Sequence, residues 1–384
     1  MLEREAMAVL VSAKQVSYGQ REAVIRRAGS ALEVVRDPYA YALILGEAGA
    51  ACVARSAKGA DAMLEKLEKS GVHLVLRGET GYPERLAHTR RAPHVLFVRG
   101  AGIDDRSAVA VVGTRRASAY GLRHTRRIAA ELAKAGVCVV SGLALGIDAQ
   151  AHEGALDAGG RTIAVLGSGI DRMTPSANRG LMDRIVASGG SIVSEYPMGI
   201  SASRYSFLER NRIIAGLCQG VLVTEGAKRS GALSTANHAL DEGRVVFALP
   251  GDIDRVSAQL PNMLIAEGAA PVSCGEDILA YLSMTHIDTG MPEKKKKRAA
   301  RGTVSEAKKE SANRTPQPAA PARPQESLTG PEKMIADLLK TSDMDFDMLG
   351  ERTGIASEDL GAILMMMELD GVIEALPGLL YRKL

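Results

Sequence analysis

The sequence "AVVGTRRASAYG", residues 110–121, passes from an apolar strand into a glycine turn that carries two arginines. The same pattern of an apolar run before a small or glycine-containing turn recurs, with predicted strand ends near Val112, Val140, Leu166, Ser194, Thr224 and Leu249. Helical stretches alternate with these runs between residues 109 and 250, which predicts a Rossmann-like, doubly wound and mostly parallel α/β sheet. The carboxyl ends of parallel strands form the ligand crevice of such a sheet, so we expect these turns to converge on one site.

Composition agrees with this fold class and limits the classes of site and the cellular compartment to be considered. The 384 residues are 46% hydrophobic and 3% aromatic, and the aliphatic runs are typical of a parallel sheet buried on both faces. The four cysteines are too scattered for a zinc knuckle or a disulfide framework. The chain has no membrane-length apolar run and no signal-peptide pattern, so we expect a cytoplasmic protein without membrane contact. Its net charge of +3 is too small to identify a nucleic-acid partner by itself.

Four segments are predicted along the chain. Residues 1–72 read as a small helical domain of the SAM or helix-hairpin-helix type, although glycine-punctuated helices more often serve packing alone. Residues 73–288 form the Rossmann-like domain, and residues 289–328, which are basic and rich in Pro, form a disordered linker. Residues 329–384 give three helices and a hairpin around Pro377 and Gly378, typical of a winged helix. Acids outnumber bases there by about two to one, which favours contact with protein over contact with DNA.

The turn after the first predicted strand suits a phosphate better than a dinucleotide. It lacks the G-x-G-x-x-G fingerprint, and the next strand ends in Ser141 and Gly142 where a dinucleotide site would carry an acid. Gly113 still permits close backbone approach, the following helix offers its N-terminal N–H groups, and Arg115 adds a bidentate guanidinium. The turn is therefore predicted to bind a phosphodiester.

Two further segments bring positive charge to the same predicted edge. In "SRYSFLERNRII", Arg204, Arg210 and Arg212 surround Phe207 and Asn211, and "AKRSGALSTA" places Lys228 and Arg229 before a helix start. Each segment alone fits a solvated loop or local salt bridges. Together, basic turns and one aromatic ring are typical of a surface that binds single-stranded nucleic acid.

Six motifs in order make the resemblance specific: "GTRRASAYG", "SGLALGIDAQAH", "TIAVLGSGIDRMTPSAN", "SEYPMG", "FLERNRIIAGL" and "SGALSTANHALDEGRVVFALPG". From about Leu74 to Val272 the chain resembles the DNA-processing protein A family, DprA or Smf. The resemblance implies a homodimeric single-stranded DNA-binding protein that protects incoming DNA and loads the RecA recombinase during natural transformation and recombination. It implies no cofactor, no metal and no catalytic residue.

The family's DNA contacts carry over by motif onto Gly113, Thr114, Arg115, Arg204, Phe207, Arg210, Asn211, Lys228, Ser230 and Gly231. By this resemblance the arginines and the lysine would neutralise phosphates, the phenyl ring would stack on a base, and the glycines would bring backbone donors close. The chain departs from the family pattern at Leu208, at Met173 and Thr174, and at Ala232. None of these departures removes a charge.

Enzymatic alternatives find less support in the sequence. Asp148 and His152 stand four residues apart on a helix, but no third metal ligand has suitable spacing, so capping by the carboxylate and packing of the imidazole are favoured. A Rossmann-like hydrolase of nucleoside monophosphates remains the alternative and would use Glu225 near the sugar. The chain lacks that family's P-G-G-x-G-T-x-x-E signature. A protein adaptor is a third possibility, supported by the acidic winged helix alone.

Overall fold

The computed structural model describes residues 1–103, 107–285, 330–340, 342–355, 357–370, 372–376 and 380–383. The chain divides into two compact units, Met1–His286 and Ile287–Leu384. The predicted linker, residues 289–328, and the hairpin tip at Pro377 and Gly378 lie outside the described residues. None of the described helices has both the length and the apolar character needed to cross a membrane.

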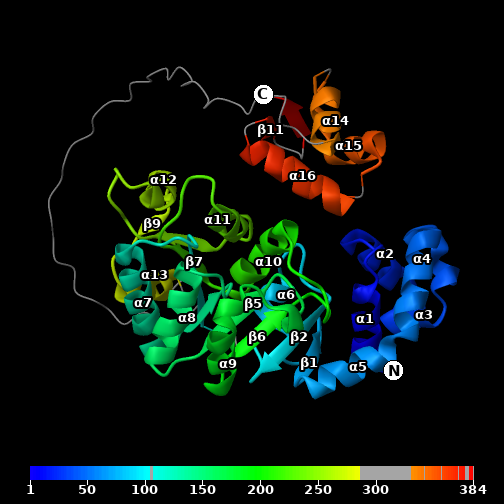
Figure 1. The fold of residues 1–384 in the computed structure, drawn as a ribbon, viewed down its shortest axis with the longest axis horizontal. Coiled ribbons are helices and arrows are strands. Elements are labelled where there is room, and N and C mark those ends of the chain that lie inside the picture. The colour runs from blue at the N-terminus through cyan, green and yellow to red at the C-terminus, as the bar shows by residue number, and fades with distance from the viewer. Residues whose placement is uncertain are drawn as a thin grey trace, which may run out of the picture. The chain divides into compact units, whose positions relative to one another are not determined.

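A nine-stranded sheet in the order β1-β2-β6-β5-β4-β3-β7-β8-β9 organises the first unit (Figure 1). Its strands are β1 (Val72–Leu76), β2 (Val95–Gly100), β3 (Ala108–Val112), β4 (Cys138–Ser141), β5 (Thr162–Leu166), β6 (Ser191–Ser194), β7 (Gly220–Val223), β8 (Val245–Ala248) and β9 (Ala270–Pro271). Neighbours from β6 through β9 pair in parallel, whereas β2 pairs antiparallel with both β1 and β6. The predicted doubly wound, mostly parallel sheet is confirmed, with an antiparallel edge that the alternating pattern after residue 109 did not predict.

Helices cover both faces of this sheet: α6 (Glu84–Ala87), α7 (Ala119–Lys134), α8 (Ile147–Asp157), α9 (Arg179–Ala187), α10 (Arg204–Leu217), α11 (Gly231–Asp241), α12 (Gln259–Ala266) and α13 (Gly275–Thr285). Strand β3 shows the division, because successive side chains point to opposite faces. Val109 and Val111 pack with α7, α8 and α13, whereas Ala110 and Val112 pack with α10, α11 and α12. In Figure 1 these two groups of helices lie on opposite sides of the strands. Burial on both faces explains the continuous aliphatic runs.

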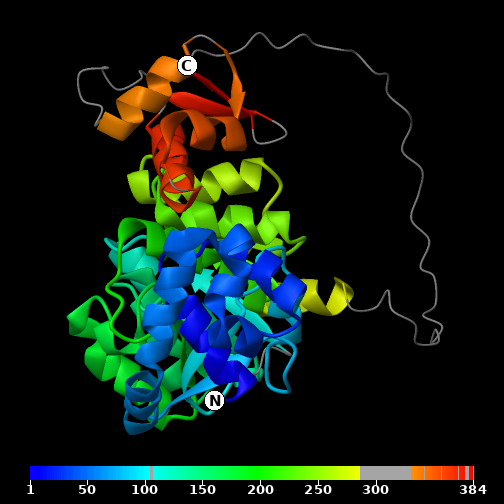
Figure 2. The ribbon, with the colours of Figure 1, turned by 90° about the vertical axis from the view of Figure 1, so that its right-hand side faces the viewer.

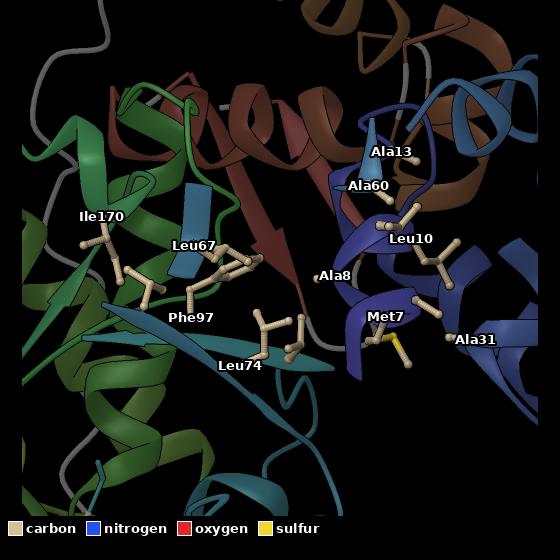
Figure 3. Close-up of a cluster of buried hydrophobic side chains, with 14 of the residues drawn as sticks. Met7, Ala8, Leu10, Ala13, Ala31, Ala60, Leu67, Leu74, Phe97 and Ile170 are labelled. Carbon is tan, nitrogen blue, oxygen red and sulfur yellow. The ribbon is translucent and has the colours of Figure 1, made fainter. Parts of the chain in front are cut away.

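The N-terminal helices are α1 (Glu3–Ser12), α2 (Tyr18–Ala28), α3 (Ala31–Arg36), α4 (Ala42–Lys58) and α5 (Ala60–Lys69), with a short 3₁₀ turn at Pro38–Tyr41. They stand at the β1 end of the sheet, and Figure 2 looks onto them. One apolar cluster joins them to it: Met7 and Leu10 of α1 belong to the same core as Phe97 of β2 and Ile170 (Figure 3). The predicted helical character of residues 1–72 is confirmed.

The second unit is a winged helix by its own topology. It contains α14 (Gly330–Leu338), α15 (Phe346–Thr353) and α16 (Ser357–Leu369), with strands β10 (Met344–Asp345), β11 (Ile373–Leu376) and β12 (Leu380–Lys383). The strands form a sheet in the order β10-β12-β11, and the antiparallel β11 and β12 make the wing. Ile335, Leu349, Leu360 and Leu364 form its buried core. The predicted winged helix is confirmed.

Candidate nucleic-acid interface

The strand order places a topological switch point between β3 and β7. From β3 the chain passes through α7 on one face to β4, and from β6 it returns through α10 on the other face to β7. Because these strands are parallel, the loops after β3, β4, β5, β6 and β7 lie at one carboxyl edge, which is where open parallel sheets bind ligands. The predicted convergence of the glycine-containing turns follows from this topology.

The turn after β3 is fixed by backbone contacts on both sides. The N–H of Thr114 donates to the carbonyl of Glu225 at 2.7 Å, and the carbonyl of Thr114 accepts from Ile147 N–H at 3.2 Å. A Cβ on Gly113 would lie 2.7 Å from that same Glu225 oxygen, so only glycine fits there. Arg115 and Arg116 are exposed beyond this fixed backbone. The turn therefore presents two exposed arginine side chains.

The first turn of α10 supplies an aromatic ring and another cation. Ser203 caps the helix by accepting from Ser206 N–H at 3.0 Å, which leaves Arg204 exposed at the first helical position. Phe207 is half-buried, and the guanidinium carbon of Arg115 lies 5.0 Å from the centroid of its ring. This distance is that of a cation–π pair, so the loop after β3 and the start of α10 share one surface.

Arg210 and Asn211 lie beneath this surface. Arg210 is 5% exposed, and its Nη1 donates to the carbonyls of Gly142, at 2.8 Å, and Val165. Burial lowers the pKa of Arg210 to about 10, and the nearby Asp148 carboxylate partly offsets that effect. Asn211 is also buried and donates to the carbonyl of Gly231 at 3.1 Å. The family resemblance implies phosphate neutralisation by Arg210, whereas its placement ties α10 to the ends of β4 and β5.

The turn before α11 brings two more exposed cations, Lys228 and Arg229. Ser230 occupies the N-cap position, yet its hydroxyl makes no capping hydrogen bond. The buried Ser230 Oγ has no hydrogen-bond partner among the described residues. Gly231 is exposed, with open space where a Cβ would stand. The first N–H groups of α11 therefore have no side-chain cap, and they lie beside two exposed cations.

Glu225 sits under the N-terminus of α7 and fills the place where Rossmann folds hold a phosphate. Its carboxylate accepts from Ser118 N–H at 2.8 Å, from the Ser118 hydroxyl at 2.6 Å and from the Ser257 hydroxyl at 3.1 Å. Glu225 is 2% exposed, and a Cβ on Gly121 would lie 2.2 Å from its Oε2. The expected phosphate-binding role of the α7 N-terminus is thus taken in part by a protein carboxylate. In the sequence, the only sign of this arrangement is an acid two residues after the end of β7, because its contact with Ser118 and Gly121 forms only in the folded sheet.

Asp148 and His152 are buried structural groups. Asp148 Oδ2 accepts from the N–H groups of Gly142 and Ala144 in the preceding loop, and burial raises the pKa of its carboxyl. The sequence predicts that Asp148 caps the N-terminus of its helix. Instead, its carboxylate binds the loop before the helix, and the N-cap residue of the helix is Gly146. His152 Nδ1 lies 2.7 Å from Thr162 Oγ1, and burial lowers the pKa of its imidazole to about 3. Within the described part of the chain, no group of three His, Cys, Asp or Glu side chains is placed to hold a metal.

The fold agrees with that of known relatives. A family model for DNA recombination-mediator protein A matches residues 73–283, and a model for the DprA winged helix domain matches residues 318–378. Protein Smf of Escherichia coli (strain K12) is 43% identical over 226 residues, which cover 59% of this chain but only 60% of that relative. Protein Smf of Synechocystis sp. is 35% identical over 334 residues, 83% of this chain and 82% of that one. The X-ray structure of DNA processing protein A from Streptococcus pneumoniae superposes with a TM-score of 0.62 at 35% identity, covering 73% of this chain and 98% of that one. The chain belongs to the DNA recombination-mediator protein A family.

Proposed function

We propose that this chain binds single-stranded DNA at its carboxyl-edge surface, defined by Arg115, Arg204, Phe207, Lys228 and Arg229. The observation that carries the proposal is the half-buried Phe207 ring with the Arg115 guanidinium 5.0 Å from its centroid. Exposed cations neutralise phosphates, and an accessible ring stacks on a base. A duplex keeps its base faces inside the stack, so this combination favours the single strand.

Gly113, Thr114, Ser230 and Gly231 complete the proposed site, with the Thr114 hydroxyl and the backbone N–H groups at the start of α11 as the expected contacts. Arg210 and Asn211 contribute by holding α10 in place, since their side chains are buried and bonded to neighbouring loops. In this proposal the exposed cations contact the phosphates, and the buried Arg210 and Asn211 hold α10 in position.

We further propose that the bound strand is held without cleavage. The nucleotide-hydrolase alternative needs a carboxylate free to act at the sugar. A pocket of about 320 Å³ borders Glu225, but this carboxylate already accepts three hydrogen bonds. Neither a metal nor a cofactor is part of the proposal.

The family's description fits a protein that mediates recombination. More specifically, we propose that this chain delivers bound DNA to the RecA recombinase during natural transformation. Curated relatives in Streptococcus pneumoniae and Bacillus subtilis carry the name DNA processing protein DprA. We propose a cytoplasmic homodimer as the working state. The exposed apolar side chains Ile253 and Val256, 85% and 64% exposed, are available for such self-association.

Fluorescence anisotropy tests the central proposal. The purified protein is titrated against labelled poly-dT and against a duplex of equal length across a salt series, with nucleoside monophosphate turnover assayed in parallel. We expect tight binding to the single strand that weakens linearly in log affinity against log salt, and no turnover. Absence of binding to either form, or release of free base from a monophosphate, would overturn the proposal.

A further inference from the structure

The loop after β4, residues 142–146, carries an unusual backbone conformation at the candidate site. Leu143 has φ of 56°, and among the described residues it alone adopts a positive φ without being a glycine. Such conformations cost free energy and cluster at functional sites, where surrounding contacts enforce them.

Two buried side chains hold the loop from inside. Asn178 Nδ2 donates to the carbonyls of Leu143, at 2.9 Å, and Ala144, at 3.2 Å. Asp148 Oδ2 accepts from Gly142 N–H at 3.2 Å and from Ala144 N–H at 3.4 Å. Because the Leu143 side chain is also fully buried, the loop is anchored on its protein side. The following residue, Leu145, is 45% exposed.

The neighbours of the loop place Leu145 within the proposed DNA site. A Cβ on Gly146 would lie 2.5 Å from the carbonyl oxygen of Thr114 and 2.8 Å from that of Arg115, so the loop touches the turn after β3. At its other end, the Gly142 carbonyl accepts from Arg210, whose guanidinium carbon is 5.9 Å from the Phe207 centroid. Leu145 therefore lies on a loop whose two ends contact the turn after β3 and Arg210, the buried arginine beside the Phe207 ring.

We propose that Leu145 is a base-contacting residue of the single-strand site, presented by a loop that Asn178 and Asp148 hold in place. An apolar side chain gains nothing from a phosphate, but it gains from burial against the face or edge of an unpaired base. Leu145 thus adds apolar contact to a surface whose other exposed members are mostly cations. The inference rests on the proposed binding of single-stranded DNA and names a further residue of that site.

The test compares Leu145→Ala with Leu43→Ala, an equally simple truncation of an exposed leucine on α4 in the N-terminal helices. Affinities for poly-dT and for an abasic oligonucleotide of equal length are measured across the same salt series. We expect Leu145→Ala to weaken poly-dT binding about fivefold, with an unchanged salt slope, because it removes apolar burial and no charge. On the abasic strand, and in Leu43→Ala, we expect no change. Leu145→Met, which keeps apolar volume, should retain the wild-type affinity.

Each outcome decides the matter. If the wild-type protein binds neither oligonucleotide, the proposed function fails and this inference fails with it. If the wild type binds poly-dT while Leu145→Ala behaves like Leu43→Ala, the function stands and the base contact is wrong. An equal loss on the abasic strand, or a changed salt slope, would also overturn the contact, because either result assigns the effect to the DNA backbone.

Discussion

In the proposed complex with DNA, Arg115 would have two competing partners, the Phe207 ring and a phosphate, and the magnitudes of the two interactions indicate which prevails. In the free protein its guanidinium lies over the half-buried Phe207 ring, an interaction worth about 0.5–1 kcal/mol at exposed sites. A base stacked on an aromatic side chain contributes about 1–3 kcal/mol, and a phosphate offers the guanidinium a charged partner. We therefore expect the strand to displace Arg115 from the ring to a phosphate. The ring is then left for a base.

The salt dependence of binding tests this assignment at single residues. Arg115→Ala and Lys228→Ala should each weaken binding to poly-dT and reduce the slope of log affinity against log salt by about 0.7, because each removes one phosphate contact. Arg36→Ala is the matched control, since Arg36 is an exposed arginine on α3 paired with Glu33. Anisotropy titrations over the salt series measure all three slopes. An unchanged slope in both site variants would remove these side chains from the phosphate contacts.

At the scale of the element, the start of α7 depends on the fit between Gly121 and Glu225. Gly121→Ala would place a methyl group 2.2 Å from Glu225 Oε2, so the carboxylate must shift away from Ser118 and Ser257. Overpacking of this kind costs about 1–3 kcal/mol of the free energy of unfolding.

The exposed Gly180 of α9 provides the control for this prediction. It has open space for a Cβ, so Gly180→Ala should leave stability unchanged or raise it by up to about 1 kcal/mol. Denaturant unfolding of both variants and the wild type measures the difference. Equal stability of Gly121→Ala and the wild type would contradict the described packing under α7.

The packing of α8 on the sheet makes stability depend on pH. Burial lowers the pKa of His152 to about 3 from an ordinary value of 6.5, so the folded protein keeps this imidazole neutral where the unfolded chain would protonate it. The resulting stability is complete above about pH 6.5 and is lost as pH falls, by about 1.4 kcal/mol per pH unit. His152→Gln should therefore reduce the pH slope of the unfolding free energy by about that amount between about pH 6 and pH 5. His94, whose pKa burial lowers to about 4, contributes equally to both proteins and cancels in the comparison. Parallel slopes for the two proteins would contradict the prediction.

The elements also show what the sequence could and could not predict. The strands from β3 to β8 were predictable, because each is an aliphatic run that ends in a small or glycine-containing turn. The antiparallel β1 and β2 were not, since pairing partners far apart in the sequence leave no local signal. At the site, the exposed positions of Arg115, Arg204 and Lys228 follow from their turns. The burial of Arg210 depends on the carbonyls of Gly142, directly after β4, and of Val165, in β5, which only the folded sheet brings together.

At the scale of the whole molecule, charge is distributed unequally between the two compact units. The carboxyl-edge surface of the first unit carries exposed arginine and lysine side chains. In the winged helix, Asp and Glu outnumber Lys and Arg by about two to one. A protein that contacts phosphates through both units would need cations on both, so we expect the proposed DNA contacts to lie on the first unit and the winged helix to contact a protein partner.

Deletion of residues 329–384 tests this division. We expect the shortened chain to bind poly-dT within about twofold of the full chain, because the removed unit supplies more repulsion than attraction toward phosphates. The two compact units have separate apolar cores, so the first should remain folded, and its denaturant unfolding provides the control. Lys228→Ala should weaken binding by the same factor in the full and the shortened chain, since independent contributions add. A loss of affinity of tenfold or more on deletion, with the first unit still folded, would instead place DNA contacts on the acidic winged helix. The residues to substitute next would then be its few cations, which include Arg352, Arg382 and Lys383.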